Sequence, residues 1–172
     1  CDIRKFFDSI QQDVLLDLIK LKINDEDAIW LIEKIVKSFA GGLPLGNVTS
    51  QLFANIYLNE LDQFIKHKLK VKYYLRYCDD FIILNKDRNF LEELICHIND
   101  FLAVELKLLL HYDKIIVRKY YQGIDFLGYV VLPHYRVLRT KTKRRIFKKI
   151  KIRKTQLENG LIAEKSFSQS LQ

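Results

Sequence analysis

The sequence predicts an α+β fold in which an antiparallel sheet carries helices on one face. The clearest observation is residues 72–84, where two apolar segments flank a tight turn at Cys78-Asp79-Asp80, a pattern typical of a β-hairpin. Segments whose apolar residues keep helical spacing precede and follow this hairpin, and short strand-like segments come after them. Hydrophobic residues make up 49% of the 172 residues, which is enough to bury a sizeable core.

Before the hairpin, the pattern predicts one buried strand followed by three helices. Ser9 and Gln12 resemble a capping box at the start of the first helix. Asn24 or Asp25 can cap the second helix, which Gly41-Gly42 is expected to stop. The predicted ranges are 2–7 for the strand, about 10–22 for the first helix, and about 50–68 for the third helix.

After the hairpin, the sequence predicts an amphipathic helix, three candidate strands and a basic helix. Glycines and Pro133 separate the strands, and Asn159-Gly160 is expected to end the basic helix. The predicted ranges are 89–106 for the amphipathic helix, 115–118, 126–131 and 136–138 for the strands, and about 140–157 for the basic helix.

Positive charge is concentrated in one segment. Residues 139–154 hold ten Lys and Arg and no acidic residue, so subtracting these ten from the formal net charge of +8 leaves −2 for the remainder. A cationic segment beside a nearly neutral body favours a polyanionic partner, most simply the backbone of a nucleic acid. The alternative is a solvated helix face, but so many charges in one short segment exceed what solubility needs.

Cysteine usage and the lack of long apolar runs exclude several classes of protein. Three cysteines without CxxC spacing argue against a disulfide scaffold or a zinc site and fit a reducing cytosol. No apolar run approaches the length of a membrane span, and no charged leader segment is visible. We therefore expect a cytoplasmic protein with no membrane partner. Because the chain has no Met and opens on a strand-like pattern, we also expect it to be a piece of a longer protein.

Three carboxylates at the ends of apolar segments are the candidate chemistry. Asp2 lies in the first predicted strand, and Asp79-Asp80 lies at the hairpin turn. Each pattern alone is weak, because Asp is common in turns. Salt bridges to Arg4, Lys5 or Arg76 are an alternative role for these carboxylates. Together the patterns are stronger, since a buried carboxylate is costly unless it is paired or binds a cation. Such an arrangement can hold two divalent metal ions over a nucleotide triphosphate.

A glycine-containing loop covers residues 42–51, with the sequence GLPLGNVTSQ. It lacks the lysine and the spacing of a P-loop, so a phosphate cradle of that kind is not expected. Its glycines allow the backbone to approach a base or sugar closely. The alternative is a plain connection between two helices.

Several segments together resemble the lettered palm motifs of reverse transcriptases. DIRKFFD, GLPLGNVTSQLFANIYL, RYCDDFIIL and GIDFLGY are similar to motifs A, B, C and E in that order, and the helix at 89–106 with Leu108–Lys114 is similar to motif D. Four motifs in order are far more specific than YxDD alone. The resemblance implies a polymerase palm over 1–138, with the fingers missing upstream, and the start of a truncated thumb over 139–172.

The resemblance implies chemical roles for individual residues of this chain. Asp2 and Asp79 match the two metal-binding aspartates, with the carbonyl of Ile3 as a further ligand. Asp80 matches a third carboxylate. Lys114 matches the motif D lysine that protonates the leaving pyrophosphate, although Lys107 is also nearby in the sequence. The implied cofactor is a pair of Mg²⁺ ions, with Mn²⁺ as a substitute.

The resemblance also implies residues that bind the substrates. Phe7 matches the aromatic residue that blocks a ribose 2′-hydroxyl and so selects deoxynucleotides. Leu45 and Gly46 match the pair that contacts the incoming nucleotide and the templating base, and Gln51 is grouped with them. The implied primer and template contacts are Leu127, Gly128 and Tyr129 as the primer grip, and Lys143, Arg144 and Lys148 on the basic helix. The implied partners are an RNA template, a DNA or RNA primer and deoxynucleoside triphosphates.

Within this family, LPLGNVTSQ is most similar to the reverse transcriptases of diversity-generating retroelements. Intron-encoded enzymes usually carry Gln at the position of Leu45 and Ser-Pro at Ser50-Gln51. The retroelement enzymes misincorporate opposite template adenine and use a basic accessory protein. Gln can hydrogen-bond the nucleotide or the template base whereas Leu cannot, so Leu45 is expected to weaken discrimination against ill-fitting pairs.

Three alternatives stay open at this point. The chain is also similar to group II intron-encoded enzymes, which combine polymerase and maturase functions. An antiviral or abortive-infection reverse transcriptase is the second alternative. The third is a non-catalytic RNA-binding module, in which exposed aromatics of the sheet, Tyr73, Tyr74 and Tyr77, would stack on bases. The missing fingers also leave open whether this segment polymerises by itself.

Overall fold

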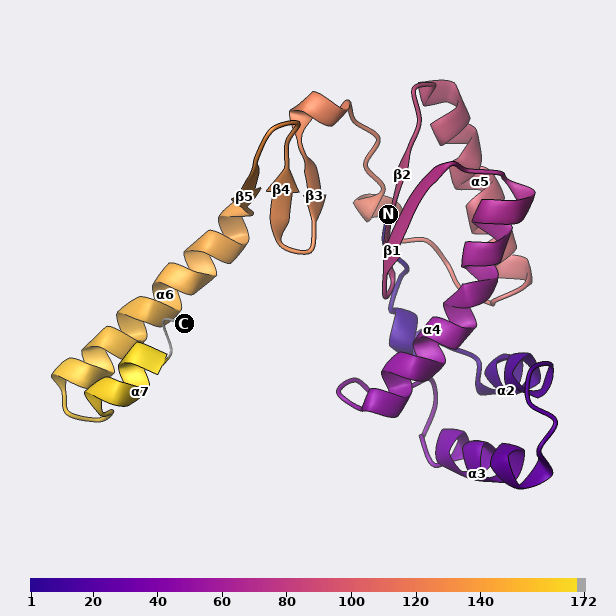
Figure 1. Cartoon of the computed structure of the whole chain (residues 1–172), viewed down its shortest axis with the longest axis horizontal. Coiled ribbons are helices and arrows are strands. Elements are labelled where there is room, and N and C mark those ends of the chain that lie inside the picture. Colours follow the sequence, from indigo (N-terminus) through magenta and orange to yellow (C-terminus); the bar gives the residue numbers. More distant parts are fainter. Residues whose placement is uncertain (170–172) are drawn as a thin grey trace. The chain divides into compact units, whose positions relative to one another are not determined.

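The computed structural model describes residues 1–169, apart from the side chain of Glu164, and divides into two compact units, Cys1–Val117 and Arg118–Gln172 (Figure 1). Helices and strands are mixed, and the strands pair antiparallel, which confirms the α+β class. The strands form two small sheets rather than one, of order β1-β2 in the first unit and β3-β4-β5 in the second.

The first unit consists of five α-helices and one β-hairpin. A π-helical turn, Phe64–Lys68, continues α4, and a 3₁₀ turn covers Tyr112–Lys114. The helices are α1 (Phe6–Ser9), α2 (Gln12–Lys20), α3 (Glu26–Lys37), α4 (Val48–Gln63) and α5 (Arg88–Val104), and the strands are β1 (Tyr73–Tyr77) and β2 (Asp80–Leu84).

The chain start differs from the predicted strand over 2–7. Only Ile3 forms a bridge, to Leu110, and the backbone then turns through Lys5, whose φ is 44°, into α1. Ile3 and Phe6 are both buried, and their three-residue spacing suits a helical turn better than a strand. The predicted strand is therefore wrong beyond Ile3.

The predicted capping box is also wrong, although both of its residues have structural roles. Ser9 belongs to α1, and α2 begins after Gln11, which makes no side-chain cap. Gln12 instead donates through Nε2 to the carbonyls of Phe39 and Gly42, at 3.2 Å each. A side chain at the start of α2 therefore anchors the loop that leads into α4.

The starts of the next two helices follow their sequence signals more closely. Asp25 caps α3, because its Oδ1 accepts a hydrogen bond from the N–H of Ala28 at 2.7 Å. Helix α4 begins at Val48, two residues before the predicted start, and its π-helical continuation reaches Lys68 as expected.

The core of the first unit lies where α2, α4, α5 and the segment after α5 meet. Tyr57 of α4 is fully buried, and its hydroxyl donates to the carbonyl of Leu106 at 2.7 Å and accepts from the N–H of Gln11 at 3.4 Å. Phe64 and Phe101 stack with their ring centroids 4.1 Å apart. Other large buried residues include Ile3, Ile10, Leu15, Leu58, Leu61, Ile65, Phe81, Leu102, Leu106 and Leu108.

The β1–β2 hairpin forms as predicted, with Tyr77 opposite Asp80 and Tyr73 opposite Leu84. Burial alternates along β1, so that Tyr74 and Arg76 face the core side while Tyr73 and Tyr77 are 56% and 60% exposed. The hairpin therefore has one face against the helices and one open face.

The second unit contains a three-stranded meander followed by two helices. The predicted strand over 126–131 is a hairpin, because Leu127 and Gly128 both have positive φ, 50° and 83°, and reverse the chain. The predicted strand over 115–118 does not form. The elements are β3 (Ile124–Phe126), β4 (Tyr129–Val131), β5 (Arg136–Leu138), α6 (Thr140–Glu158) and α7 (Glu164–Gln169).

Helix α6 matches the predicted basic helix and ends at Glu158, with Asn159 as its C-cap and Gly160 following with a φ of 71°. Among residues 1–169, no helix combines the length and apolar character needed to cross a membrane.

Replacing Tyr57 by Phe is expected to lower the free energy of unfolding by about 1–3 kcal/mol, because it leaves the buried carbonyl of Leu106 without its donor. Chemical denaturation followed by circular dichroism measures this. Tyr73→Phe, on the open face of the hairpin, is the matched control and should change stability by less than about 0.5 kcal/mol. Equal effects of the two substitutions would contradict the assignment.

Candidate active site

Backbone hydrogen bonds on both sides hold Asp2 in place. On one side, Cys1 pairs with Phe81 of β2, with its amino group donating to the Phe81 carbonyl at 2.9 Å and its carbonyl accepting from the Phe81 N–H at 3.0 Å. On the other side, the Asp2 carbonyl accepts from the N–H of His111 at 2.9 Å. The first residues of the chain thus lie between β2 and the segment after α5, and the Asp2 side chain is only 15% exposed.

Asp79 and Asp80 lie at the tip of the β1–β2 hairpin. The turn consists of Cys78 and Asp79, and Cys78 has a φ of 51°, in the left-handed region that residues with a Cβ rarely adopt. Asp80 is the first residue of β2, opposite Tyr77. Because Cys1 is bonded to the next residue of β2, the turn brings both carboxylates close to Asp2.

The electrostatics show that the three carboxylates are neighbours. Partial burial raises the pKa of Asp79, and the nearby carboxylates of Asp2 and Asp80 raise it further, against an opposing hydrogen bond from its own backbone N–H. Like charges gathered in a partly desolvated place make this a position where a cation is favoured.

Lys114 is the cation that the chain itself brings to this cluster. Its Nζ forms an ion pair with Oδ2 of Asp2, although the two residues are far apart in the sequence. This hydrogen bond is the main cause that raises the pKa of Lys114, and Asp80 and Asp79 contribute in the same direction. Lys107, the other candidate, instead donates to the carbonyl of Val104 at the end of α5. The 54% exposed side chain of Lys114 also faces solvent.

The carboxylate oxygens of this cluster are ligands of the kind that a divalent metal ion such as Mg²⁺ binds. Within residues 1–169, no group of three or more His, Cys, Asp or Glu side chains is arranged to hold a metal ion by itself. Mg²⁺ does not need such a cage, because it is usually bound through one or two carboxylates together with substrate phosphates and water. Asp2 and Asp79 provide two carboxylates of this kind, so the donor set fits.

The predicted nucleotide-binding residues lie around the loop before α4. Gly42 has a φ of 54°, and a Cβ there would lie 2.3 Å from the carbonyl oxygen of Phe7, so only glycine fits this approach. The N–H of Leu43 donates to that same oxygen at 2.8 Å. The loop is therefore fastened directly to the segment that carries Phe7, whose half-buried ring packs edge-on against Phe6.

Beyond this attachment the loop projects into solvent. Leu45 is 77% exposed, and Gly46 has a φ of 98° with open space around its Cα. Gln51 is exposed in the first turn region of α4. These three residues are accessible to a ligand, whereas Gly42 and Leu43 are buried as the base of the loop.

The predicted primer-grip residues form the β3–β4 turn of the second unit. Leu127 and Tyr129 are exposed, and Arg136 lies over the Tyr129 ring, 5.5 Å from its centroid. The carbonyl of Gly128 accepts from the N–H of Arg139 at 2.9 Å, and Arg139 pairs with Asp125 at 2.8 Å. The turn is thus attached to the start of α6.

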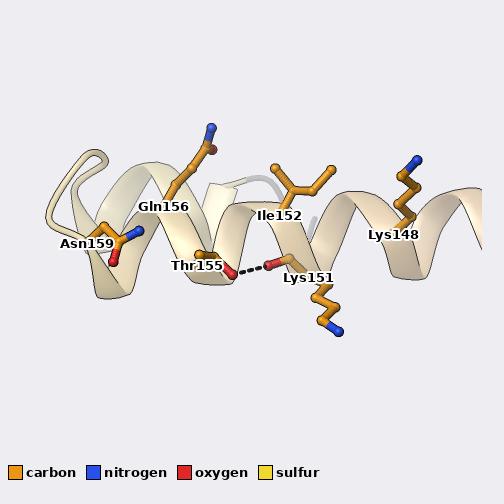
Figure 2. Close-up of a pocket in the computed structure, with 6 residues that line it drawn as sticks. All are labelled: Lys148, Lys151, Ile152, Thr155, Gln156 and Asn159. Atoms are coloured by element: carbon orange, nitrogen blue, oxygen red, sulfur yellow. Dashed lines mark hydrogen bonds between the residues drawn. The ribbon is translucent and has the colours of Figure 1, made fainter.

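Lys143, Arg144 and Lys148 are exposed on α6, which therefore presents its cations to solvent. Farther along this helix, Figure 2 shows an open pocket in which Lys148, Ile152 and Gln156 project to one side and Lys151 to the opposite side. Thr155 donates through its hydroxyl to the carbonyl of Lys151 at 3.2 Å, and the remaining lining residue is Asn159.

Two residues with structural roles at the site were missed by sequence reasoning. Gln12, interpreted as part of a capping box, anchors the loop before α4. Arg76, considered as a partner for the predicted metal-binding carboxylates, pairs with Asp62 of α4. The Gly41-Gly42 pair was a usable signal for the close backbone approach, but neither side-chain partner has a local sequence signal.

Replacing Asp79 by Asn is expected to raise the melting temperature at pH 7 in the absence of divalent ions. Since the pKa of Asp79 is raised in the folded state, folding favours its protonated form, and stability falls as pH rises through that pKa. The gain should disappear at acid pH, where Asp79 is protonated in both the folded and unfolded states. Thermal melts of both proteins between pH 3 and 8 measure this difference (roughly the range in which a carboxyl titrates).

The control for this pH series is Asp17→Asn, which changes an exposed carboxylate of α2 and should give no pH-dependent gain. A constant difference between Asp79→Asn and the parent chain at every pH would show that burial and neighbouring charge do not act on Asp79.

Comparison with known proteins gives relatives that share part of this chain. The putative COX1/OXI3 intron 2 protein of Saccharomyces cerevisiae is 23% identical over 76% of this chain and 23% of its own length. The group II intron-encoded protein LtrA of Lactococcus lactis subsp. cremoris is 40% identical over 42% of this chain and 14% of its own length. An uncharacterized 91 kDa protein in cob intron of Schizosaccharomyces pombe is 40% identical over 38% of this chain and 9% of its own length.

The chain spans less than a quarter of the length of each of these relatives. The family model described as reverse transcriptase (RNA-dependent DNA polymerase) matches residues 1–131, which is most of the chain and includes the carboxylate cluster and the loop before α4. This chain therefore belongs to the reverse transcriptase family.

Proposed function

We propose that this chain is the palm and the start of the thumb of an RNA-directed DNA polymerase, with the palm over 1–138 and the thumb beginning at 139. The observation that carries the proposal is the convergence of Asp2, Asp79, Asp80 and Lys114 from three separate parts of the sequence. Partly buried carboxylates with a lysine among them are suited to nucleotidyl transfer.

Asp2, Asp79 and the carbonyl of Ile3 would hold the Mg²⁺ ions, with Mn²⁺ as a substitute. When bound, these ions would activate the primer 3′-hydroxyl and neutralise charge on the triphosphate. Asp80 adds negative charge beside them. The ammonium of Lys114 is protonated at neutral pH, as a lysine ordinarily is, and its hydrogen bond to Asp2 raises its pKa further. It could therefore donate a proton to the leaving pyrophosphate oxygen.

The residues around the loop before α4 would select the incoming nucleotide. Phe7 would exclude a ribose 2′-hydroxyl, and its fixed backbone supports this role, because its carbonyl is bonded to Leu43. Leu45, Gly46 and Gln51 are accessible for contacts with the incoming nucleotide and the templating base.

In the second unit, Leu127, Gly128 and Tyr129 would grip the primer. The exposed cations Lys143, Arg144 and Lys148 of α6 would follow the phosphate backbone of the duplex, a role that predicts salt-dependent binding. The proposed partners are an RNA template, a DNA or RNA primer and deoxynucleoside triphosphates. A basic accessory protein is a further proposed partner.

We also propose that the enzyme is error-prone and belongs to a diversity-generating retroelement in a bacterial, archaeal or phage genome, acting in the cytoplasm. The supporting observation is Leu45, an exposed side chain without hydrogen-bonding groups at the nucleotide-contacting position of the loop. The alternative is an intron-encoded reverse transcriptase and maturase, which is favoured by relatives whose names place them in introns.

Polymerase activity is tested with the protein in the longest form that its gene encodes, by extension of a primer on an RNA template with Mg²⁺. Asp79→Asn is expected to reduce extension by at least about a hundredfold, because it removes a carboxylate on which metal catalysis depends. Asp17→Asn is the matched control and should leave extension unchanged. Extension that survives Asp79→Asn would contradict the assigned role.

No extension by the folded parent protein would favour the RNA-binding alternative. The structure narrows that alternative, because Tyr73 and Tyr77 are exposed on the open face of the hairpin while Tyr74 is turned inward and donates to Asp62 at 2.7 Å. Loss of RNA binding in Tyr73→Ala and Tyr77→Ala would then support it.

Leu45→Gln is expected to reduce misincorporation opposite template adenine by about tenfold, since a hydrogen-bonding side chain restores discrimination against ill-fitting pairs. Sequencing of the cDNA measures the error frequency at each template base. Leu45→Val is the control, because it keeps the aliphatic character and should keep the error pattern. An unchanged error frequency in Leu45→Gln would contradict the role of Leu45, and accurate copying by the parent would favour the intron-encoded alternative.

A further inference from the structure

Arg76 of β1 has more hydrogen-bond partners than a stabilising ion pair requires. Its side chain is only 10% exposed and faces the helices. Nε donates to Oδ1 of Asp62 at 2.7 Å, and Nη2 donates to Oδ2 of the same carboxylate. Nη1 donates to the carbonyl of Cys78 at 3.0 Å and to Oδ1 of Asn55 at 3.2 Å. One guanidinium therefore joins α4 to the turn of the hairpin.

The bond to the Cys78 carbonyl bears directly on Asp79. That carbonyl belongs to the peptide plane between Cys78 and Asp79, so holding it fixes the direction in which the Asp79 backbone leaves the turn. Cys78 has a φ of 51°, in the left-handed region that is unfavourable for a residue with a Cβ, so the turn gains from an external support. Arg76 provides that support from two residues away.

Asp62 fixes the guanidinium at its other end. Its carboxylate receives two hydrogen bonds from Arg76 in a fork, and Tyr74 also donates to it at 2.7 Å. Asp62 lies near the end of α4, the helix whose start is preceded by the loop of Leu45 and Gly46. These hydrogen bonds therefore hold the Asp79 turn against α4, the helix that follows the nucleotide-binding loop.

We propose that Arg76 is a positioning residue, which clamps the Cys78–Asp79 turn to α4 through Asp62 and so holds Asp79 in the orientation that binds a metal ion. The part concerning metal binding rests on the proposed function. A partly buried ion pair is weak evidence for stability by itself, whereas a role in fixing geometry accounts for the bond to the turn. Lysine cannot replace arginine here, because an ammonium lacks the planar fork that reaches both partners.

The first test measures the turn and does not depend on polymerase activity. In a background with Cys1→Ser and Cys96→Ser, the rate at which a thiol reagent labels the half-buried Cys78 reports how accessible the turn is. Arg76→Lys is expected to raise this rate about tenfold, the effect of losing one hydrogen bond to a charged group. Arg88→Lys is the matched control, because Arg88 pairs with Glu92 on the exposed surface of α5, and it should leave the rate unchanged.

The second test measures metal affinity. Mn²⁺ binding, followed by electron paramagnetic resonance, is expected to weaken about tenfold in Arg76→Lys and to be unchanged in Arg88→Lys, since residues that orient a metal ligand typically affect affinity to this extent. If the parent chain does not bind Mn²⁺, the proposed metal-binding function is contradicted. The Cys78 labelling rate then tests by itself whether Arg76 holds the turn against α4.

A third variant separates positioning from stability. Arg76→Lys combined with Asp62→Glu restores the length of the ion pair but not the bond to the Cys78 carbonyl. We expect the free energy of unfolding to return toward that of the parent, while the labelling rate and the Mn²⁺ affinity stay changed. Recovery of all three, or an unchanged labelling rate in Arg76→Lys alone, would overturn the proposal.

Should Arg76→Lys fail to fold, Asp62→Asn provides a milder change, since it keeps one acceptor for the guanidinium. It is expected to raise the Cys78 labelling rate by a smaller factor, about threefold. A rate equal to that of the parent would overturn the clamp in that case.

Discussion

The backbone pairing of the first residues with two other segments is the constraint on which the candidate site depends. Cys1 is bonded to Phe81 of β2, and Asp2 and Arg4 are bonded to the segment Leu109–His111. Since one segment touches both neighbours, it fixes the distance between the hairpin turn and the 3₁₀ turn that carries Lys114. The side chain of Asp2 then lies close to Asp79 and pairs with Lys114.

This arrangement brings three carboxylates together in a partly buried place, where their mutual repulsion opposes folding. The raised pKa of Asp79 shows that burial and the neighbouring carboxylates disfavour its charged form. Lys114 offsets part of this cost by pairing with Asp2, and a bound divalent cation would offset more. A cluster that destabilises the chain without a ligand is characteristic of functional sites, which often conflict with stability.

Hydrogen bonds and close backbone contacts hold the surroundings of the cluster together. Gly42 allows the loop before α4 to approach the Phe7 carbonyl closely, and the side chain of Gln12 in α2 donates a hydrogen bond to the same loop. Arg76 connects the hairpin turn to α4 by hydrogen bonds. The side chains that would contact a nucleotide, such as Leu45, project beyond this base into solvent. A fixed base with exposed contact residues suits a site that must accept and release successive substrates.

Local sequence patterns were enough to predict several features of the fold and the family. Two apolar segments around a tight turn predicted the hairpin, the pattern of residues 140–157 predicted α6, and four motifs in order predicted the reverse transcriptase family. Each of these signals lies within one short stretch, where backbone preference and side-chain periodicity act together. The carboxylates were found in the same way, because each belongs to a recognisable motif.

The contacts between distant groups, in contrast, depend on tertiary packing. It turned the predicted strand over 2–7 into one bridge and a helical turn, because Leu110 offered a partner to Ile3 alone. In the folded chain, Lys114 and not Lys107 pairs with Asp2, and Arg76 forms its ion pair with Asp62. Hydrogen bonds and ion pairs between residues far apart in the chain depend on which faces pack together, and a local sequence window carries no information about that choice.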